Sequence, residues 1–297
     1  MTSSTLEEIG MSITAYPVTD PVSEHGEGPV WSARWGGLRW VDMLAGDVLA
    51  LDGATVRRRH VGKVAAALRP RAAGGYVVAA ERELLLADSD DLDAPLRPLG
   101  GEAWSDPSVR MNDGGCDPDG RFYIGSMAYD AAPGRGSFYV AEPGGALRVV
   151  LPEVTISNGF DFSPDGSLAY YADTATGRVD VFDYDPDEGL GGRRPFVYID
   201  PERGQPDGLT VDAEGGVWVA LWQGGAVHRY DPAGRLDAVV ALPARKVTAV
   251  AFGGDDLDRL FVTTSALDVD RAEQPEAGAL FAADPGVRGR PVLPAAL

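Results

Sequence analysis

Three oxygen-bearing side chains each directly precede a glycine in well-separated parts of the chain: Glu27, Asn158 and Asp207. Two carboxylates and one amide oxygen are hard donors, and none of the three is a sulfur or an imidazole. This donor set favours Ca²⁺, Mg²⁺ or Mn²⁺ over a structural zinc site. Read alone, Asn-Gly and Asp-Gly are more typical of ordinary turns. Read together, the three residues predict a divalent-metal site, if the fold brings them to one place.

A second polar cluster contains Arg110, Asn112 and Asp113, which lie within four positions of one another. It precedes a Pro-Asp-Gly turn and the apolar run 122–124, and a cluster of this kind suits binding a small polar molecule better than building a core. Cys116, the only cysteine, lies beside it. A lone thiol is more typical of a small buried filler than of a nucleophile, and one cysteine excludes an internal disulfide, which fits a reducing cytoplasm.

Other catalytic motifs are missing from the sequence. The histidines His25, His60 and His228 do not have metalloprotease spacing, and there is no G-x-S-x-G elbow, P-loop or dinucleotide fingerprint. His25 is two residues from Glu27, so it is a candidate for lining the same site.

Composition excludes several classes of protein. The 297 residues carry a formal net charge of −19, which would repel a phosphate backbone and argues against nucleic-acid binding. No apolar run reaches the length of a transmembrane span, and the first 20 residues lack the apolar stretch of a signal peptide. We therefore expect a cytoplasmic protein that does not bind membranes.

A repeat organises the chain. Short β-rich runs that follow Gly-containing turns recur at intervals of about 37 to 48 residues, centred on Trp40, Val77, Tyr123, Tyr170, Trp218 and Phe261. Six units of about four strands each indicate an all-β fold, a six-bladed β-propeller with a central metal site. A β-helix is the rival, but its repeats are shorter. The tryptophans at 31, 40, 218 and 222 are expected to fill the layers between blades, although Trp222 could reach the channel mouth.

The propeller sets the expected boundaries. We expect residues 1–11 to be a disordered N-terminal extension and residues 12–297 to form one domain. To close the ring, a strand at 12–17 should pair into the blade that contains 279–283. The candidate site residues precede the aligned strands, so their entry loops should converge on one mouth of the channel.

At this point the sequence resembles the senescence marker protein/gluconolactonase/luciferin-regenerating enzyme family, from about residue 20 to the C-terminus. The resemblance rests on several ordered motifs: Glu27-Gly-Pro-Val-Trp31, Arg110-x-Asn112-Asp-Gly with Asp117-Pro-x-Gly-Arg121, Ser157-Asn158-Gly159, Pro206-Asp207-Gly208 and Ala251-Phe-Gly-Gly254.

The resemblance implies that one divalent cation is held by Glu27, Asn158 and Asp207, with Ca²⁺ as the first expectation and Zn²⁺, Mg²⁺ or Mn²⁺ as alternatives. It also implies that Arg110 and Asn112 bind substrate. In the family an acidic residue after the Gly-Ser/Thr-Met segment can touch substrate hydroxyls, and here the corresponding residue is the shorter Asp130, preceded by Tyr129.

The activity implied is hydrolysis of a small lactone, such as the sugar lactone gluconolactone, to its hydroxy acid. Asp207 would serve as the general base that deprotonates water, in addition to being a metal ligand. We expect a monomer or a weak homo-oligomer with the lactone as its partner. Two alternatives remain open: a related propeller hydrolase acting on phosphoesters or fluorophosphates, and a non-catalytic metal-binding or scaffold propeller.

Overall fold

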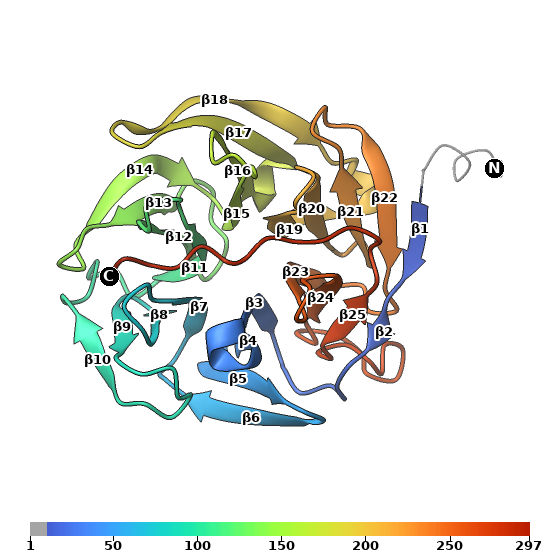
Figure 1. Cartoon of the computed structure of the whole chain (residues 1–297), viewed down its shortest axis with the longest axis horizontal. Helices are drawn as coiled ribbons and strands as arrows, with labels where there is room; N and C mark the ends of the chain where they lie inside the picture. Colours follow the sequence, from blue (N-terminus) through green and yellow to red (C-terminus); the bar gives the residue numbers. More distant parts are fainter. Residues whose placement is uncertain (1–10) are drawn as a thin grey trace.

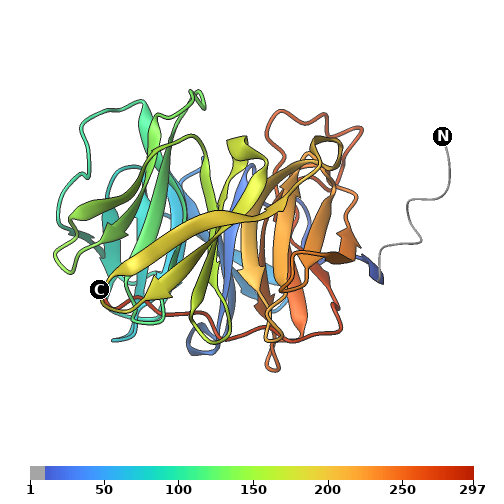
Figure 2. The same cartoon turned by 90° about the horizontal axis from the view of Figure 1, so that it is seen from above.

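Six β-sheets surround a central axis in the computed structural model, which describes residues 11–297 (Figure 1). Five sheets have four strands and one has five. The all-β, six-bladed propeller predicted from the repeat is thus confirmed. Seen from the side, the blades form a disc whose two faces carry the connecting loops (Figure 2).

The first three blades are built in chain order from the innermost strand outward. Their strands are β3 (Gly26–Ser32), β4 (Gly37–Asp42), β5 (Asp47–Asp52) and β6 (Thr55–His60), then β7 (Ala65–Pro70), β8 (Tyr76–Ala80), β9 (Leu84–Ala87) and β10 (Leu96–Leu99), then β11 (Val109–Cys116), β12 (Phe122–Ala128), β13 (Gly136–Ala141) and β14 (Leu147–Val154).

The last three blades follow the same order. Their strands are β15 (Ser157–Phe162), β16 (Leu168–Asp173), β17 (Arg178–Asp185) and β18 (Gly189–Tyr198), then β19 (Gln205–Val211), β20 (Val217–Trp222), β21 (Ala226–Tyr230) and β22 (Leu236–Ala241), then β23 (Val247–Gly253), β24 (Arg259–Thr264) and β25 (Phe281–Ala283). Short 3₁₀ turns at Ala33–Trp35, Thr174–Thr176 and Pro201–Arg203 complete the described elements.

The repeat centres all fall on the second strand of their blades, from Trp40 on β4 to Phe261 on β24. The motifs that precede these centres therefore form the innermost strands. The expectation that the site residues lie in entry loops is wrong, because polar side chains that face a central channel resemble a loop in the sequence.

The N-terminal segment closes the ring, but through two blades. β2 (Tyr16–Pro17) pairs with β25, with Tyr16 opposite Ala282, as predicted for this segment. β1 (Met11–Thr14) pairs instead with β22 of the preceding blade, in parallel. Residues 1–10 of the expected extension lie outside the described residues, whereas Met11 already belongs to β1.

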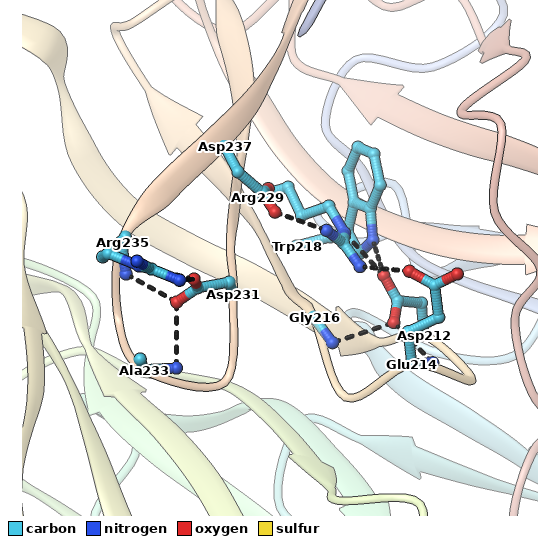
Figure 3. A network of polar contacts seen from close by, with 9 residues as sticks. All are labelled: Asp212, Glu214, Gly216, Trp218, Arg229, Asp231, Ala233, Arg235 and Asp237. Atoms are coloured by element: carbon cyan, nitrogen blue, oxygen red, sulfur yellow. Dashed lines mark hydrogen bonds and ion pairs between the residues drawn. The ribbon is translucent and has the colours of Figure 1, made fainter. Parts of the chain in front are cut away.

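Aspartates fix the turns between strands, as Figure 3 shows for Asp212 and Asp231 of the fifth blade. Asp212, fully buried, accepts hydrogen bonds from the Gly216 amide at 2.8 Å, from Trp218 Nε1 at 2.8 Å and from Arg229 Nε at 2.7 Å. Because its carboxylate is both paired and hydrogen-bonded, its burial is compensated. Asp212 thus connects its own turn to β20 and β21 and supports the blade.

Large apolar side chains fill the layers between blades. Trp40 and Trp218 are almost fully buried, and Trp31 stacks on Phe261 with ring centroids 6.0 Å apart. The packing role expected for these three tryptophans is confirmed. In the described chain, no helix is long and apolar enough to cross a membrane.

The C-terminal segment runs across one face of the propeller, over the end of the central channel (Figure 1). The Arg290 guanidinium pairs with Asp161 at 3.3 Å, and the Ala295 amide donates to the Pro70 carbonyl at 2.8 Å. We call residues 290–297 the C-terminal strap. Beneath it lies a cavity of about 70 Å³, lined among others by Cys116 and Arg290.

A candidate metal and substrate site in the central channel

Every innermost strand has a register shift relative to its neighbour. The shifts fall between Glu27 and Val30, Ala65 and Ala67, Met111 and Gly114, Ser157 and Phe160, Pro206 and Leu209, and Val247 and Ala249. A bulge adds an unpaired residue and turns its side chain away from the pleat. Four of the six bulges coincide with the predicted site motifs, and they orient those side chains toward the channel.

The glycines that follow two site residues allow the innermost strands to approach closely. A Cβ atom at Gly159 would lie 2.5 Å from the Leu209 amide nitrogen, and one at Gly208 would lie 2.5 Å from Ala249 Cβ. Both glycines lie inside strands, β15 and β19. The alternative that Asn158-Gly159 and Asp207-Gly208 are ordinary turns is therefore wrong.

A cavity of about 250 Å³ occupies the end of the channel opposite the C-terminal strap. It is lined by His25, Glu27, Leu44, Arg110, Asn112, Met127, Tyr129, Ile156, Asn158, Thr174, Gln205, Asp207, Trp222 and Leu267. The fold thus brings together the three expected metal ligands and the Arg-Asn pair, from four blades. A cavity of this size suits a small molecule.

Of the candidates, Asp113 does not line this cavity, and neither does Asp130. Asp130 is exposed in the turn after β12, where its carboxylate accepts the Ala132 amide at 3.0 Å. Tyr129 lines the cavity in its place. The Tyr129 amide donates to the Ser108 carbonyl at 2.9 Å, which extends the strand pairing by one residue before the turn begins.

A chain of side-chain hydrogen bonds connects the candidate substrate-binding and metal-binding residues. Arg110 Nη1 donates to Asn112 Oδ1 at 2.6 Å, and Asn112 Nδ2 contacts Asn158 Oδ1 at 3.2 Å. Asn158 Nδ2 in turn donates to Thr174 Oγ1 at 2.8 Å. Thr174 thereby fixes the amide of Asn158 with its oxygen toward the channel, a role that no local sequence signal revealed.

The carboxylates of Glu27 and Asp207 are buried with too few hydrogen bonds to offset the loss of water. Burial, and then the nearby charge of Asp113, raises the pKa of Glu27 to about 8. Burial, and then the charges of Glu27 and Asp113, raises the pKa of Asp207 well above its usual range. Among residues 11–297, Glu27 accepts a hydrogen bond only from the Gly28 amide, at 3.1 Å, and Asp207 Oδ1 is buried without a hydrogen-bond partner.

These features fit a divalent cation. Two carboxylates that are costly to ionise alone, one of them with an unpartnered oxygen, form an anionic oxygen cluster beside a fixed amide oxygen. Within residues 11–297, no three His, Cys, Asp or Glu side chains gather as a metal-holding group. The candidate set is consistent with that finding, because its third member is an asparagine.

The cationic and aromatic residues complete the site. Burial lowers the pKa of Arg110 to about 10, and its Nε has no hydrogen-bond partner in the described part of the chain. Burial, followed by the charges of Arg110 and Lys246, lowers the pKa of His25 to about 3, so its ring is neutral. His25 Nδ1 lies 2.9 Å from Ser265 Oγ, and the ring meets Trp222 edge-on with centroids 5.9 Å apart. Trp222 thus reaches the channel mouth.

Cys116 takes no part in this site. Its thiol is buried at the opposite end of the channel, and burial raises its pKa to about 12. A thiol so hard to ionise is a poor nucleophile, as expected of a buried filler.

Comparison with known proteins agrees with this arrangement. The model of the SMP-30/gluconolactonase/LRE-like region matches residues 25–266. The chain belongs to this family. Regucalcin from Danio rerio is 35% identical over 292 residues, which cover 94% of this chain and 97% of the relative.

Two solved structures of the SMP-30/gluconolactonase/LRE-like fold are also similar. A calcium-binding protein, regucalcin, from Agrobacterium tumefaciens has a TM-score of 0.89 at 28% identity, covering 97% of this chain and 98% of the other. A luciferin-regenerating enzyme has a TM-score of 0.86 at 29% identity, covering 95% and 100%.

Proposed function

We propose that this family member is a divalent-metal-dependent hydrolase that opens a small lactone to its hydroxy acid. Glu27, Asn158 and Asp207 would hold the cation, with Ca²⁺ as the first candidate. The observation that carries the proposal is Asp207 Oδ1, a buried carboxylate oxygen without a hydrogen-bond partner among residues 11–297, on a residue that lines the same cavity as Glu27 and Arg110. Membership of a family whose description includes gluconolactonase supports the reaction class.

When bound, the cation supplies positive charge that polarises the lactone carbonyl and eases deprotonation of water. Asp207 accepts the proton as the water oxygen bonds to the carbonyl carbon, an assistance worth about 10²–10⁴-fold. Arg110, desolvated and with a free Nε, faces the negative charge that develops on the substrate. The ring C–O bond then breaks, and the alkoxide takes the proton back from Asp207.

The first test is a panel of lactones assayed by acid release with a pH indicator, before and after chelation. Ca²⁺, Zn²⁺, Mg²⁺ and Mn²⁺ are restored one at a time. We expect hydrolysis to disappear on chelation and to return with one or more cations. Full activity in metal-free protein would refute the metal requirement. Turnover of a phosphotriester or fluorophosphate alone would favour the related hydrolase, and metal binding without any turnover would favour a non-catalytic propeller.

A second test separates the two roles of Asp207. Asp207→Asn keeps the shape and an oxygen donor but loses the base, so kcat should stay at least about 10²-fold low at saturating metal. Asn158→Ala weakens the metal site without touching the base, so saturating metal should restore most of kcat. A near-normal kcat for metal-saturated Asp207→Asn would exclude the base and leave the ligand role intact.

A further inference from the structure

The mouth of the substrate cavity is apolar, unlike its floor. Six apolar or aromatic side chains line the cavity: Leu44, Met127, Tyr129, Ile156, Trp222 and Leu267. All except Met127 are half-buried or exposed. The ionic and amide side chains Glu27, Arg110, Asn112, Asn158 and Asp207 are buried on the innermost strands.

These apolar residues come from five of the six blades, each near the same end of its strands. Leu44 follows β4, Ile156 directly precedes β15, and Leu267 follows β24. Partly exposed apolar side chains scattered singly are ordinary, whereas a ring of them around a cavity marks a contact with an apolar ligand group.

The remaining blade, the second, holds Tyr129 in place at the mouth of the cavity. Glu81, which follows β8, accepts hydrogen bonds from the Tyr129 hydroxyl and from Lys63 Nζ. The Lys63 ammonium lies 4.7 Å from the centre of the Tyr129 ring, and the Arg110 guanidinium lies 5.7 Å from it. The hydroxyl of Tyr129 is therefore already hydrogen-bonded to Glu81, so Tyr129 offers the cavity mainly its apolar ring.

At the same position, the acidic side chain expected to contact substrate hydroxyls is absent from the cavity, since Asp130 is exposed in the turn. Among the described residues, the other polar side chains that line the cavity are Gln205, Thr174, whose hydroxyl already accepts Asn158 Nδ2, and His25, whose Nδ1 is bonded to Ser265. A polyhydroxylated ligand would leave several hydroxyls against hydrocarbon, which is unfavourable without replacement hydrogen bonds.

We infer that the site prefers lactones with a hydrocarbon substituent over polyhydroxylated sugar lactones. This rests on the lactonase function proposed above and names its substrate class. The lactone ring lies on the polar floor beside Arg110 and Asp207. A short alkyl or aryl group lies against Tyr129, Trp222 and Leu267 at the mouth.

The test compares kcat/KM for γ-lactones that carry side chains of one to four carbons with that for glucono-δ-lactone. Each added methylene should raise kcat/KM about fourfold, the ratio that corresponds to about 0.8 kcal/mol per buried CH₂. A flat series, or a sugar lactone that exceeds the whole series, would overturn the inference.

Variants locate the effect. Tyr129→Gln should lower kcat/KM for the longest lactone at least tenfold while sparing the shortest, whereas Tyr129→Phe, which keeps the ring, should stay within about threefold of the parent. Tyr198→Gln is the matched control, because Tyr198 is 67% exposed on the outer strand β18. An equal effect of Tyr129→Gln on all chain lengths would contradict the assigned role.

Lactams, which resist hydrolysis, distinguish this inference from the proposed reaction. Calorimetry should give tighter binding of an alkyl-substituted γ-lactam than of a polyhydroxylated lactam. If no lactone is hydrolysed but the alkyl-substituted lactam binds more tightly, the proposed function is refuted and the inferred preference for a hydrocarbon substituent is supported. The reverse order, or equal affinity, refutes the apolar mouth whatever the catalytic result.

Discussion

Replacing Glu27 by glutamine should stabilise the metal-free protein at neutral pH. Its pKa is raised from 4.5 to about 8 in the folded protein, by burial and then by Asp113. Between these values the folded state keeps a proton that the unfolded chain has lost, so the stability contributed by Glu27 is present below pH 4.5 and is lost as pH rises toward 8. At about 1.4 kcal/mol per pH unit, the loss at pH 7 is about 3 kcal/mol.

Glu27→Gln removes this titration while keeping the shape of the side chain. Urea unfolding of chelated parent and variant, followed at several values between pH 4.5 and 8, gives the free energy of unfolding of each. The two curves should nearly coincide at the acid end and diverge to about 3 kcal/mol at pH 7. Glu273→Gln is the control, because Glu273 is exposed and its substitution should leave the curve unchanged.

Two results would refute this reasoning. One is a difference between Glu27→Gln and parent that does not depend on pH. The other is a metal-free parent that gains stability from this site as pH rises from 4.5 to 8. A divalent cation should stabilise the parent more strongly at higher pH and should have much less effect on the variant, which lacks one anionic ligand.

Three further outcomes follow from the packing. Gly208→Ala should cost about 1–3 kcal/mol in urea unfolding, because the new Cβ would lie 2.5 Å from Ala249 Cβ. Arg229→Ala should cost about 3–5 kcal/mol in the same assay, because it leaves the fully buried Asp212 without its ion-pair partner at 2.7 Å. Burial, and then the charge of Arg203, lowers the pKa of His228 from 6.5 to about 4. The folded protein therefore loses stability as pH falls from about 6.5 through 4, because the unfolded chain binds a proton that the folded one does not. His228→Gln should make acid unfolding less steep over that range.

The repeat was predictable from sequence because its signals are local. Gly-containing turns and β-rich runs recur along the chain, and the aligned centres such as Trp40 and Trp218 fall on equivalent strands. The innermost strands were mistaken for loops because a bulge interrupts the alternation of side chains at the very residues that face the channel.

The expected metal ligands could be predicted from the sequence, whereas several other residues that line the cavity could not. Glu27, Asn158 and Asp207 stand in recognisable motifs, whereas Thr174 and Leu267 reach the cavity from connections that carry no distinctive pattern. Whether Tyr129 or Asp130 faces the cavity depends on how far β12 pairs beyond its end, a tertiary contact with Ser108.

The C-terminal strap covers one end of the central channel. A cavity of about 70 Å³ lies beneath the strap, compared with about 250 Å³ on the site side, so we expect ligands to enter and leave at the site side. For the proposed reaction, a neutral lactone arrives and a carboxylate departs. A protein of net charge −19 repels an anion that has left the site but does not hinder a neutral molecule. The net negative charge should therefore disfavour return of the anionic product without affecting entry of the neutral substrate. Raising the ionic strength should weaken this difference.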